Sequence, residues 1–556
     1  MHLKKEKRPS LPAARFNQEK YQYSIIVRML TAHPLSPEDL MRLSLFLPCF
    51  LMFCQPSFAK DGAALPAGAS VETDPKFPPV VSYTLKNGLK LLILEKHFVP
   101  TVALTLTFKV GNVDSPQGKT GLAHLFEHMA FKGSKTMNTS DYAKEKVVLD
   151  KIETAAKELI VEETLYDAAD PKKLELLRKN LTDLEKEADK YAVTGELSRV
   201  YGELGESGLN AGTSQDYTTY MVSLPSSRLE AWMVIESDRF KNAVLREFYR
   251  ERSVVMEERR MYESDPSQIV SETLYATAFA AHPYRNGVVG WMDDLKRLTR
   301  TDAEKFFNAY YAPNNATLAV VGDVKPAEVI RLVEKHFNDW KAKEIQAAPI
   351  TKEPQQASEK RVNVFAKAQP MIRLAFHNPG LASPEMPSLI MLSEILSSGK
   401  TARFYRSLVE GSQVALYAHS ASMTPGIRYP SLFLIAAAPK APHTMEELET
   451  AVWAEIDRLK KEPPTAWEME RVINNYEADM VKQLEGSHEL SNNLAINQQI
   501  LGDWKFDWKL MEKMRALKPE EVSAAARKYF TRGNYTAVFL RQPEPTEAGP
   551  AKGEAK

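Results

Sequence analysis

Short apolar runs that alternate with polar residues predict strands in the first half of the chain. Residues 80–85 (VVSYTL) and 89–94 (LKLLIL) flank Asn87-Gly88, and an Asn-Gly pair between two apolar runs is a strong signal for a β-hairpin. A third strand is predicted over residues 101–110. The unbroken apolar run over residues 318–322 predicts a buried strand that ends this half of the chain.

A charged stretch over residues 142–200 carries apolar residues three and four positions apart, the spacing of one helix face. They are Leu149, Ile152, Ala156 and Leu159, followed by Leu174, Leu177, Leu181, Leu184, Ala188 and Tyr191. Asp170 and Pro171 interrupt the pattern, and these residue types favour a helix N-cap and the first helical position. We expect an antiparallel helical hairpin, which is either a lid or partner-docking arm, or an insertion that the surface tolerates.

The composition changes again between residues 341 and 360, where scattered Pro, Gln, Lys and Glu predict a linker. A second half starts at about residue 361. Residues 542–556 have no apolar pattern and are predicted to be disordered. The two halves share no repeat that the sequence alone establishes.

Length and charge narrow the class of protein. A chain of 556 residues with 44% hydrophobic residues buries ample core and is expected to form more than one domain. Its formal net charge is zero and its pI is about 7.2, so nothing favours nucleic acid or an anionic membrane surface as a partner.

The N-terminal 59 residues predict an extension followed by a secretory signal. Residues 41–59 (MRLSLFLPCFLMFCQPSFA) have a basic start, a short apolar run and a small last residue, the pattern of a cleaved signal peptide rather than a membrane span. We expect translation to start at Met41, with Met1 and Met29 as alternatives. Both cysteines fall inside the signal, so the mature chain would have no disulfide framework. We expect an exported protein, located in the periplasm.

The most informative motif is His124-Leu-Phe-Glu127-His128. Residues three and four apart share one face of a helix, so the two imidazoles can bind one metal ion while Glu127 stands beside it. Two neutral imidazoles and a carboxylate suit zinc, and a non-ligand carboxylate can take a proton from water. The alternative is an amphipathic helix whose histidines face the core or solvent.

The predicted metal site needs a third protein ligand, and Glu251 and Glu258 are the best candidates. They are two helical turns apart and therefore project from the same face. One would bind the metal while the other holds a ligand histidine. The alternative is an exposed acidic helix, which the spacing alone favours.

Several segments together match one family of peptidases. They are residues 121–133 (GLAHLFEHMAFKG), 209–213 (LNAGT) and 250–258 (RERSVVMEE), joined by His282-Pro-Tyr, Gly290 and residues 310–323 (YYAPNNATLAVVGD). The chain thus resembles the pitrilysin/insulinase zinc metallopeptidases, the inverzincins with an HxxEH motif, and especially bacterial members similar to mitochondrial processing peptidase. The resemblance runs from about residue 78 to about residue 540.

This resemblance implies an α+β fold of two related domains, each an antiparallel sheet packed against helices. The first domain would span residues 75–340, contain the helical hairpin and carry the metal. The second would span residues 361–541 without a metal, since its counterpart of the motif helix, residues 383–396, has no histidine.

The resemblance also implies the roles of the site residues. His124, His128 and Glu258 would bind one Zn²⁺ per chain. Glu127 would be the general base, and Glu251 would assist catalysis by supporting a ligand histidine.

The substrate side of the site is expected on the alternating segment that follows residue 209. An exposed strand edge beside the metal would pair with an extended peptide and read little of its sequence, and the resemblance implies Asn210 and Ala211 as substrate-binding residues. The alternative is an ordinary sheet strand in which Asn210 makes a turn.

The second half departs from the family in one respect. Family members with a full site have an arginine and a tyrosine there that bind the substrate carbonyl. Tyr417 matches the tyrosine, whereas Val409 or Glu410 stands in place of the arginine. A half-site of this kind implies that a second chain completes the chamber, so we expect a homodimer or a heterodimer with a non-catalytic homologue.

The sequence thus predicts a zinc-dependent endopeptidase or oligopeptidase that hydrolyses peptides or unfolded segments. The alternative is a non-catalytic scaffold or peptide-binding subunit of a peptidase-like complex.

Overall fold

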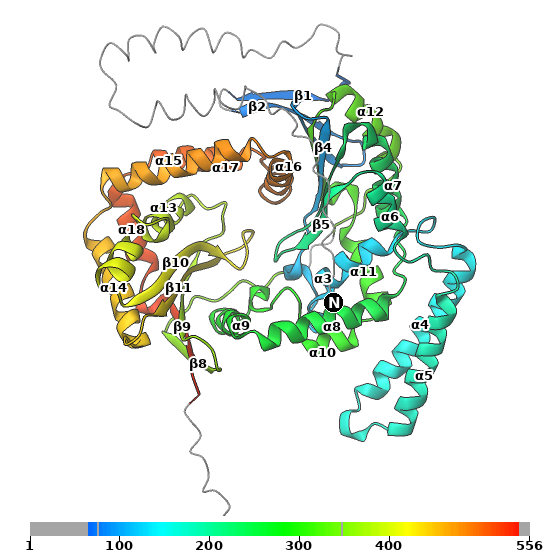
Figure 1. Cartoon of the computed structure of the whole chain (residues 1–556), viewed down its shortest axis with the longest axis horizontal. Helices are drawn as coiled ribbons and strands as arrows, with labels where there is room; N and C mark the ends of the chain where they lie inside the picture. Colours follow the sequence, from blue (N-terminus) through cyan, green and yellow to red (C-terminus); the bar gives the residue numbers. More distant parts are fainter. Residues whose placement is uncertain (1–64, 75–76, 346–348, 544–556) are drawn as a thin grey trace, which may run out of the picture. The chain divides into compact units, whose positions relative to one another are not determined.

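The computed structural model of the chain describes residues 65–74, 77–345 and 349–543. The predicted signal, the translation start and most of the predicted tail lie outside these residues. The described residues form one compact unit, which contains two β-sheets, each packed against helices (Figure 1). In the described part of the chain, none of the helices is long and apolar enough to cross a membrane.

The first sheet has seven strands in the order β1-β2-β3-β7-β4-β6-β5. In chain order they are β1 (Ser70–Asp74), β2 (Phe77–Thr84), β3 (Lys90–Glu95), β4 (Thr101–Phe108), β5 (Ser207–Thr213), β6 (Thr218–Pro225) and β7 (Ala316–Gly322). The predicted hairpin at Asn87-Gly88 joins β2 to β3, which pair antiparallel. The sheet begins at Ser70, five positions before the predicted start of the domain, because β1 pairs with β2.

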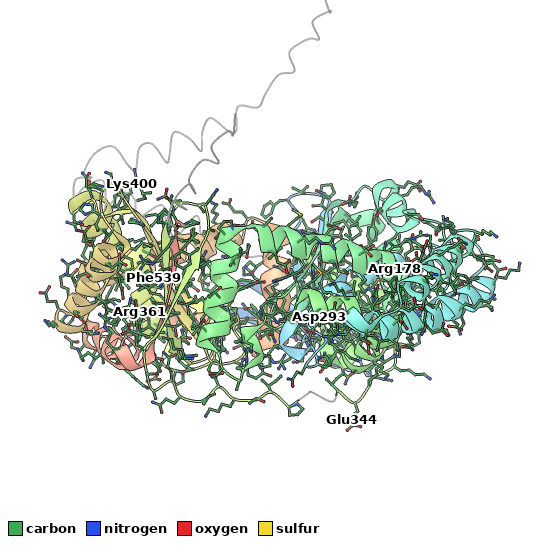
Figure 2. All side chains as sticks on the ribbon, turned by 90° about the horizontal axis from the view of Figure 1, so that it is seen from below. Arg178, Asp293, Glu344, Arg361, Lys400 and Phe539 are labelled. Carbon is green, nitrogen blue, oxygen red and sulfur yellow. The ribbon has the colours of Figure 1, made fainter. Side chains whose placement is uncertain are left out.

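The second sheet has five strands in the order β10-β11-β9-β12-β8. They are β8 (Lys360–Phe365), β9 (Met371–Asn378), β10 (Ala415–Thr424), β11 (Ser431–Pro439) and β12 (Tyr535–Arg541). Strands β8 and β12 are neighbours, and the guanidinium of Arg361 on β8 lies 5.3 Å from the ring centre of Phe539 on β12 (Figure 2).

The two sheets repeat one topology that the sequence did not reveal. The order β3-β7-β4-β6-β5 of the first sheet corresponds strand for strand to β8-β12-β9-β11-β10 of the second. In each sheet one pair of neighbours, β3 with β7 and β8 with β12, is parallel. The predicted antiparallel sheets are therefore confirmed apart from these pairs. A parallel neighbour needs a long crossover, and in both halves nearly the whole domain separates the two strands.

Helices cover the sheets on their core faces. Those of the first half are α3 (Leu122–Met129), α7 (Leu229–Lys241), α8 (Phe248–Ser264), α10 (Met292–Arg297), α11 (Arg300–Tyr310) and α12 (Pro326–Phe337). Those of the second half are α13 (Met386–Ser397), α14 (Met445–Lys461), α15 (Ala466–Gln483), α17 (Phe506–Arg515) and α18 (Pro519–Tyr529). Each set builds its own apolar core against its own sheet.

One helix from each half crosses to the sheet of the other half. Helix α16 (Ser487–Ile496) packs Leu490 and Leu494 against the outer face of the first sheet, where Ser491 Oγ lies 2.8 Å from Thr105 Oγ1. Helix α9 (Pro266–Ala278) packs on the second sheet in the same way, through an apolar cluster that includes Leu274. This exchange joins the two halves through buried apolar surface.

The predicted helical hairpin is formed by α4 (Tyr142–Glu163) and α5 (Pro171–Ala188), which pack against each other and extend away from the first sheet (cyan in Figure 1). The carboxylate of Asp170 accepts hydrogen bonds from the first backbone N–H groups of α5, as predicted for an N-cap. Arg178 of α5, labelled in Figure 2, donates to Glu163 of α4 over 2.9 Å. Residues 196–200 of the predicted hairpin belong instead to a separate helix, α6 (Glu196–Glu203), which leads into β5.

Candidate metal centre

Helix α3 carries the HxxEH motif, and two glycines fix where this helix begins. Gly121, its N-cap, has a φ of 82°, and a Cβ there would lie 2.3 Å from the carbonyl oxygen of Val289. Gly290 has a φ of 85°, and a Cβ there would lie 2.5 Å from the backbone of Thr120 and Gly121. Only glycine permits both the left-handed backbone and this close approach, so the loop before α10 holds the first turn of α3.

The apolar face of α3 turns the motif away from the core. Leu122, Leu125, Phe126 and Met129 are buried, which leaves the opposite face of the helix to His124, Glu127 and His128. Helix α8 packs against α3 and brings its own carboxylates to that face. The sequence-predicted residues from two distant segments therefore meet at one place.

His124, His128 and Glu258 form the only group of three or more metal-ligating side chains that converge in the described part of the chain, with their ligand atoms within 4.8 Å of one another. Oε2 of Glu258 lies 3.6 Å from His124 Nε2, and Oε1 lies 3.7 Å from His128 Nε2. Two atoms that bind one tetrahedral zinc lie about 3.4 Å apart. The three side chains thus fit a zinc ion with little movement, and their N,N,O donor set is one that zinc accepts.

The pKa values of the two histidines shift in opposite directions, and that of His124 suits a metal ligand. Burial, aided by the neighbouring His128, lowers the pKa of His124 to about 4, so this ring is neutral at pH 7 and has a free lone pair. Burial by itself would lower the pKa of His128 as well. The hydrogen bond to Glu251 and the charges of Glu258, Glu251 and Glu127 outweigh it and raise that pKa.

Glu251 is placed as the partner of a ligand histidine. Its Oε1 lies 3.0 Å from Nδ1 of His128, and the hydrogen bond from this ring is the main cause that lowers the pKa of Glu251 to about 2. The ionised carboxylate accepts from Nδ1–H, which directs the Nε2 lone pair of His128 toward Glu258.

A lysine that was not predicted holds Glu251 from the other side. Lys132, just after α3, lies 2.7 Å from Oε2 of Glu251 and 3.1 Å from Oε2 of Glu247. Glu247 is the N-cap of α8 and has a φ of 55°. The sequence offered only one signal for this contact, which is the position of Lys132 one helical turn beyond His128.

Glu127 points to a different neighbour. Burial raises its pKa, and hydrogen bonds from Thr213 oppose the shift. The hydroxyl of Thr213 donates to Oε2 of Glu127 over 2.7 Å. Thr213 lies in the predicted motif of residues 209–213, but sequence reasoning assigned it no role.

The two predicted substrate residues of the first half lie on a sheet edge beside α3. Strand β5 is the last strand of the first sheet, and helix α3 packs against it. On this strand Asn210 is exposed and Ala211 is half-buried. The backbone of β5 on its open side is therefore available to pair with an extended chain.

Tyr417 belongs to the other sheet. It lies on β10, the corresponding edge strand, where its ring stacks on that of His419 with centroids 5.5 Å apart. Its predicted role in binding substrate stays a prediction, as does the replacement of the arginine by Val409 or Glu410.

A cavity of about 340 Å³ opens beside Glu127 and His128. Phe131 and Leu197 give it apolar walls, while Lys132 and Glu247 add charge.

Comparisons with known proteins identify the family of this chain. The family model described as insulinase (peptidase family M16) matches residues 90–166 and 185–290, and the model described as peptidase M16 inactive domain matches residues 297–476. The chain belongs to the insulinase family of peptidases, M16. The unmatched residues 167–184 fall in the turn of the helical hairpin and most of α5.

Individual relatives extend over most of the chain. Zinc protease PqqE of Helicobacter pylori (strain ATCC 700392 / 26695) is 26% identical over 485 residues, and the match covers 85% of this chain and 95% of that protein. The crystal structure of a protease from Helicobacter pylori superposes with a TM-score of 0.69 at 26% identity, covering 84% of this chain and 100% of the other. The first half of the periplasmic protease PqqL from Escherichia coli shares the fold with a TM-score of 0.61 at 18% identity, covering 86% and 93%.

Proposed function

We propose that this chain is a zinc-dependent peptidase that hydrolyses extended peptides or unfolded protein segments. The observation that carries the proposal is the convergence of His124, His128 and Glu258 on one point, with Glu127 beside them. Membership of the insulinase family and the similarity to a protein named zinc protease support it.

In this proposal three residues bind the metal and a fourth, Glu127, transfers the proton. Zinc, when bound by the two histidines and Glu258, would polarise the scissile carbonyl and lower the pKa of water. Glu127 would take the proton from the attacking water and deliver it to the leaving amine. Burial raises the pKa of this carboxyl, which makes it a better base than an exposed glutamate.

The open edge of β5 would hold the substrate. A peptide that pairs with β5 binds mainly through its backbone, so recognition would depend on an extended conformation more than on sequence. The cavity lined by Phe131 and Leu197 would receive one side chain next to the scissile bond. Asn210 and Ala211 would contact the peptide from β5.

A non-catalytic scaffold or peptide-binding subunit is the second candidate. The match of residues 297–476 to a model described as an inactive domain favours it for the second half, where α13 has no histidine. The first half differs, because it carries all three candidate ligands together with Glu127. A scaffold would bind peptides without cutting them.

We further propose that the chain is exported to the periplasm and works with a second chain. The apolar segment over residues 41–59 supports export. The predicted replacement of the family's arginine by Val409 or Glu410 supports a partner, either a second copy or a non-catalytic homologue that would supply the lacking group.

Incubation of the purified protein with a mixture of unstructured peptides, followed by mass spectrometry, tests the proposed activity. We expect cleavage that stops when zinc is chelated and returns when zinc is restored. Bound but intact peptides would support the scaffold. Cleavage that survives complete removal of zinc would contradict the zinc mechanism.

A further inference from the structure

The general base proposed above is held by the strand that would bind the substrate. Thr213 is the last residue of β5, the edge strand of the first sheet. Its hydroxyl donates to Oε2 of Glu127 over 2.7 Å. One residue therefore joins the edge strand to α3 through a side-chain hydrogen bond.

This contact decides which oxygen of Glu127 is available for chemistry. Among the described residues, Thr213 is the one whose side chain donates to this carboxylate. An ionised carboxylate accepts through both oxygens, and with Oε2 occupied, Oε1 remains to meet the attacking water. A freely rotating carboxylate would present this oxygen for only part of the time, and small errors in placement are costly in catalysis.

The location of Thr213 on β5 has a second consequence. A peptide that pairs with β5 takes its register from the backbone of that strand. Because Thr213 belongs to the same strand, it would hold the Glu127 carboxylate at a constant position relative to the scissile bond of that peptide. A base held only by α3 would move relative to the peptide whenever the helix and the strand shifted.

We propose that Thr213 is a positioning residue for the proposed hydrolysis, which aligns the Glu127 carboxylate with a peptide bound on β5. This inference rests on the proposed peptidase function. It assigns Thr213 no contact with the reacting atoms, since it acts through Glu127.

Steady-state kinetics of three variants of the full chain test the inference. Thr213→Val removes the hydroxyl but keeps the shape and the backbone N–H, and Thr213→Ser restores a hydroxyl. Thr107→Val is the matched control, because Thr107 lies on β4 of the same sheet, separated from β5 by β6, and its hydroxyl pairs with that of Thr219 over 3.0 Å. Bound zinc is measured for each variant.

We expect Thr213→Val to lower kcat about tenfold or more while KM and the zinc content stay close to wild type. Thr213→Ser is expected to recover most of kcat, and Thr107→Val to leave it unchanged. Unchanged kcat in Thr213→Val would overturn the inference, as would an equal loss in Thr213→Ser, which would indicate a packing role. If the wild-type chain binds zinc but cuts no peptide, the proposed function itself fails, and the inference fails with it.

Discussion

Nδ1 of His128 on α3 lies 3.0 Å from Oε1 of Glu251 on α8, and this contact joins the two helices that form the candidate metal centre. It fixes the tautomer of the ring and so determines which nitrogen faces Glu258. Lys132 holds the other oxygen of Glu251, so the carboxylate is restrained at both ends.

Replacement of Glu251 is expected to weaken zinc binding without abolishing it. Glu251→Gln replaces the charged carboxylate that accepts the hydrogen bond from Nδ1–H of His128 by a neutral amide. The loss of such a partner typically lowers metal affinity by roughly 10- to 100-fold. Competition with a chromophoric chelator measures this affinity. Glu247→Gln is the matched control, because Glu247 contacts Lys132 rather than a ligand histidine, and we expect a smaller change. An affinity in Glu251→Gln equal to wild type would contradict the supporting role.

Loss of a ligand has a stronger effect. His124→Ala leaves two candidate ligands, too few for a tight zinc site, and we expect the purified variant to contain little zinc by elemental analysis. The variant is expected to keep its fold, because His124 lies on the face of α3 opposite the buried residues. Circular dichroism of the variant checks the fold. A variant that retains one zinc per chain would show that the metal binds elsewhere.

The helical hairpin is expected to be separable from the chemistry. Asp170→Ala removes the side-chain acceptor at the start of α5, which destabilises a helix by about 1 kcal/mol. We expect faster hydrogen exchange in α5 with unchanged zinc content and peptide cleavage. A marked loss of cleavage would instead favour the lid or docking-arm interpretation.

The second half contains an acid-sensitive ion pair. Burial would raise the pKa of Glu468, but hydrogen bonds from Arg403 and Thr465 outweigh it and lower the pKa to about 2, against an ordinary value of 4.5. A carboxyl group whose pKa is lower in the folded than in the unfolded chain stabilises the fold at pH values above its unfolded pKa. This stabilisation is lost as the pH falls toward the folded pKa. The pair therefore contributes fully above pH 4.5, by about 3 kcal/mol, and almost nothing near pH 2.

Thermal unfolding of Glu468→Gln tests this assignment. We expect a lower midpoint than wild type at pH 7 and a difference that shrinks below pH 4.5. The control is Glu477→Gln, whose partner Arg515 lies 2.9 Å away on an exposed surface, where an ion pair is worth little. A difference between Glu468→Gln and wild type that stays constant from pH 7 to pH 3 would contradict the assignment.

Local sequence patterns predicted the parts of the fold that depend on local chemistry. The Asn87-Gly88 turn, the N-cap at Asp170 and the helix that carries the HxxEH motif follow from residue types at fixed spacing, and the structure has all three. The same spacing argument placed Glu251 and Glu258 on one face of α8, and both approach His128.

Features that depend on distant partners did not emerge from the sequence. Leu490 and Leu494 lie four residues apart in the sequence, but nothing local says that they pack on the sheet of the other half. The parallel pair of β3 and β7 joins segments more than 200 residues apart. Thr213 was overlooked for a similar reason, because its contact with Glu127 requires β5 to lie beside α3.

The central claim is that Glu127 acts as the base next to a zinc held by other residues, and a comparison of Glu127→Gln with wild type tests it most directly. Zinc content and peptide turnover are measured on the same two preparations. We predict equal zinc in both and a turnover in the variant that is lower by roughly 10²- to 10⁴-fold. Turnover near the wild-type rate with zinc retained would show that Glu127 is not the base and would contradict the mechanism.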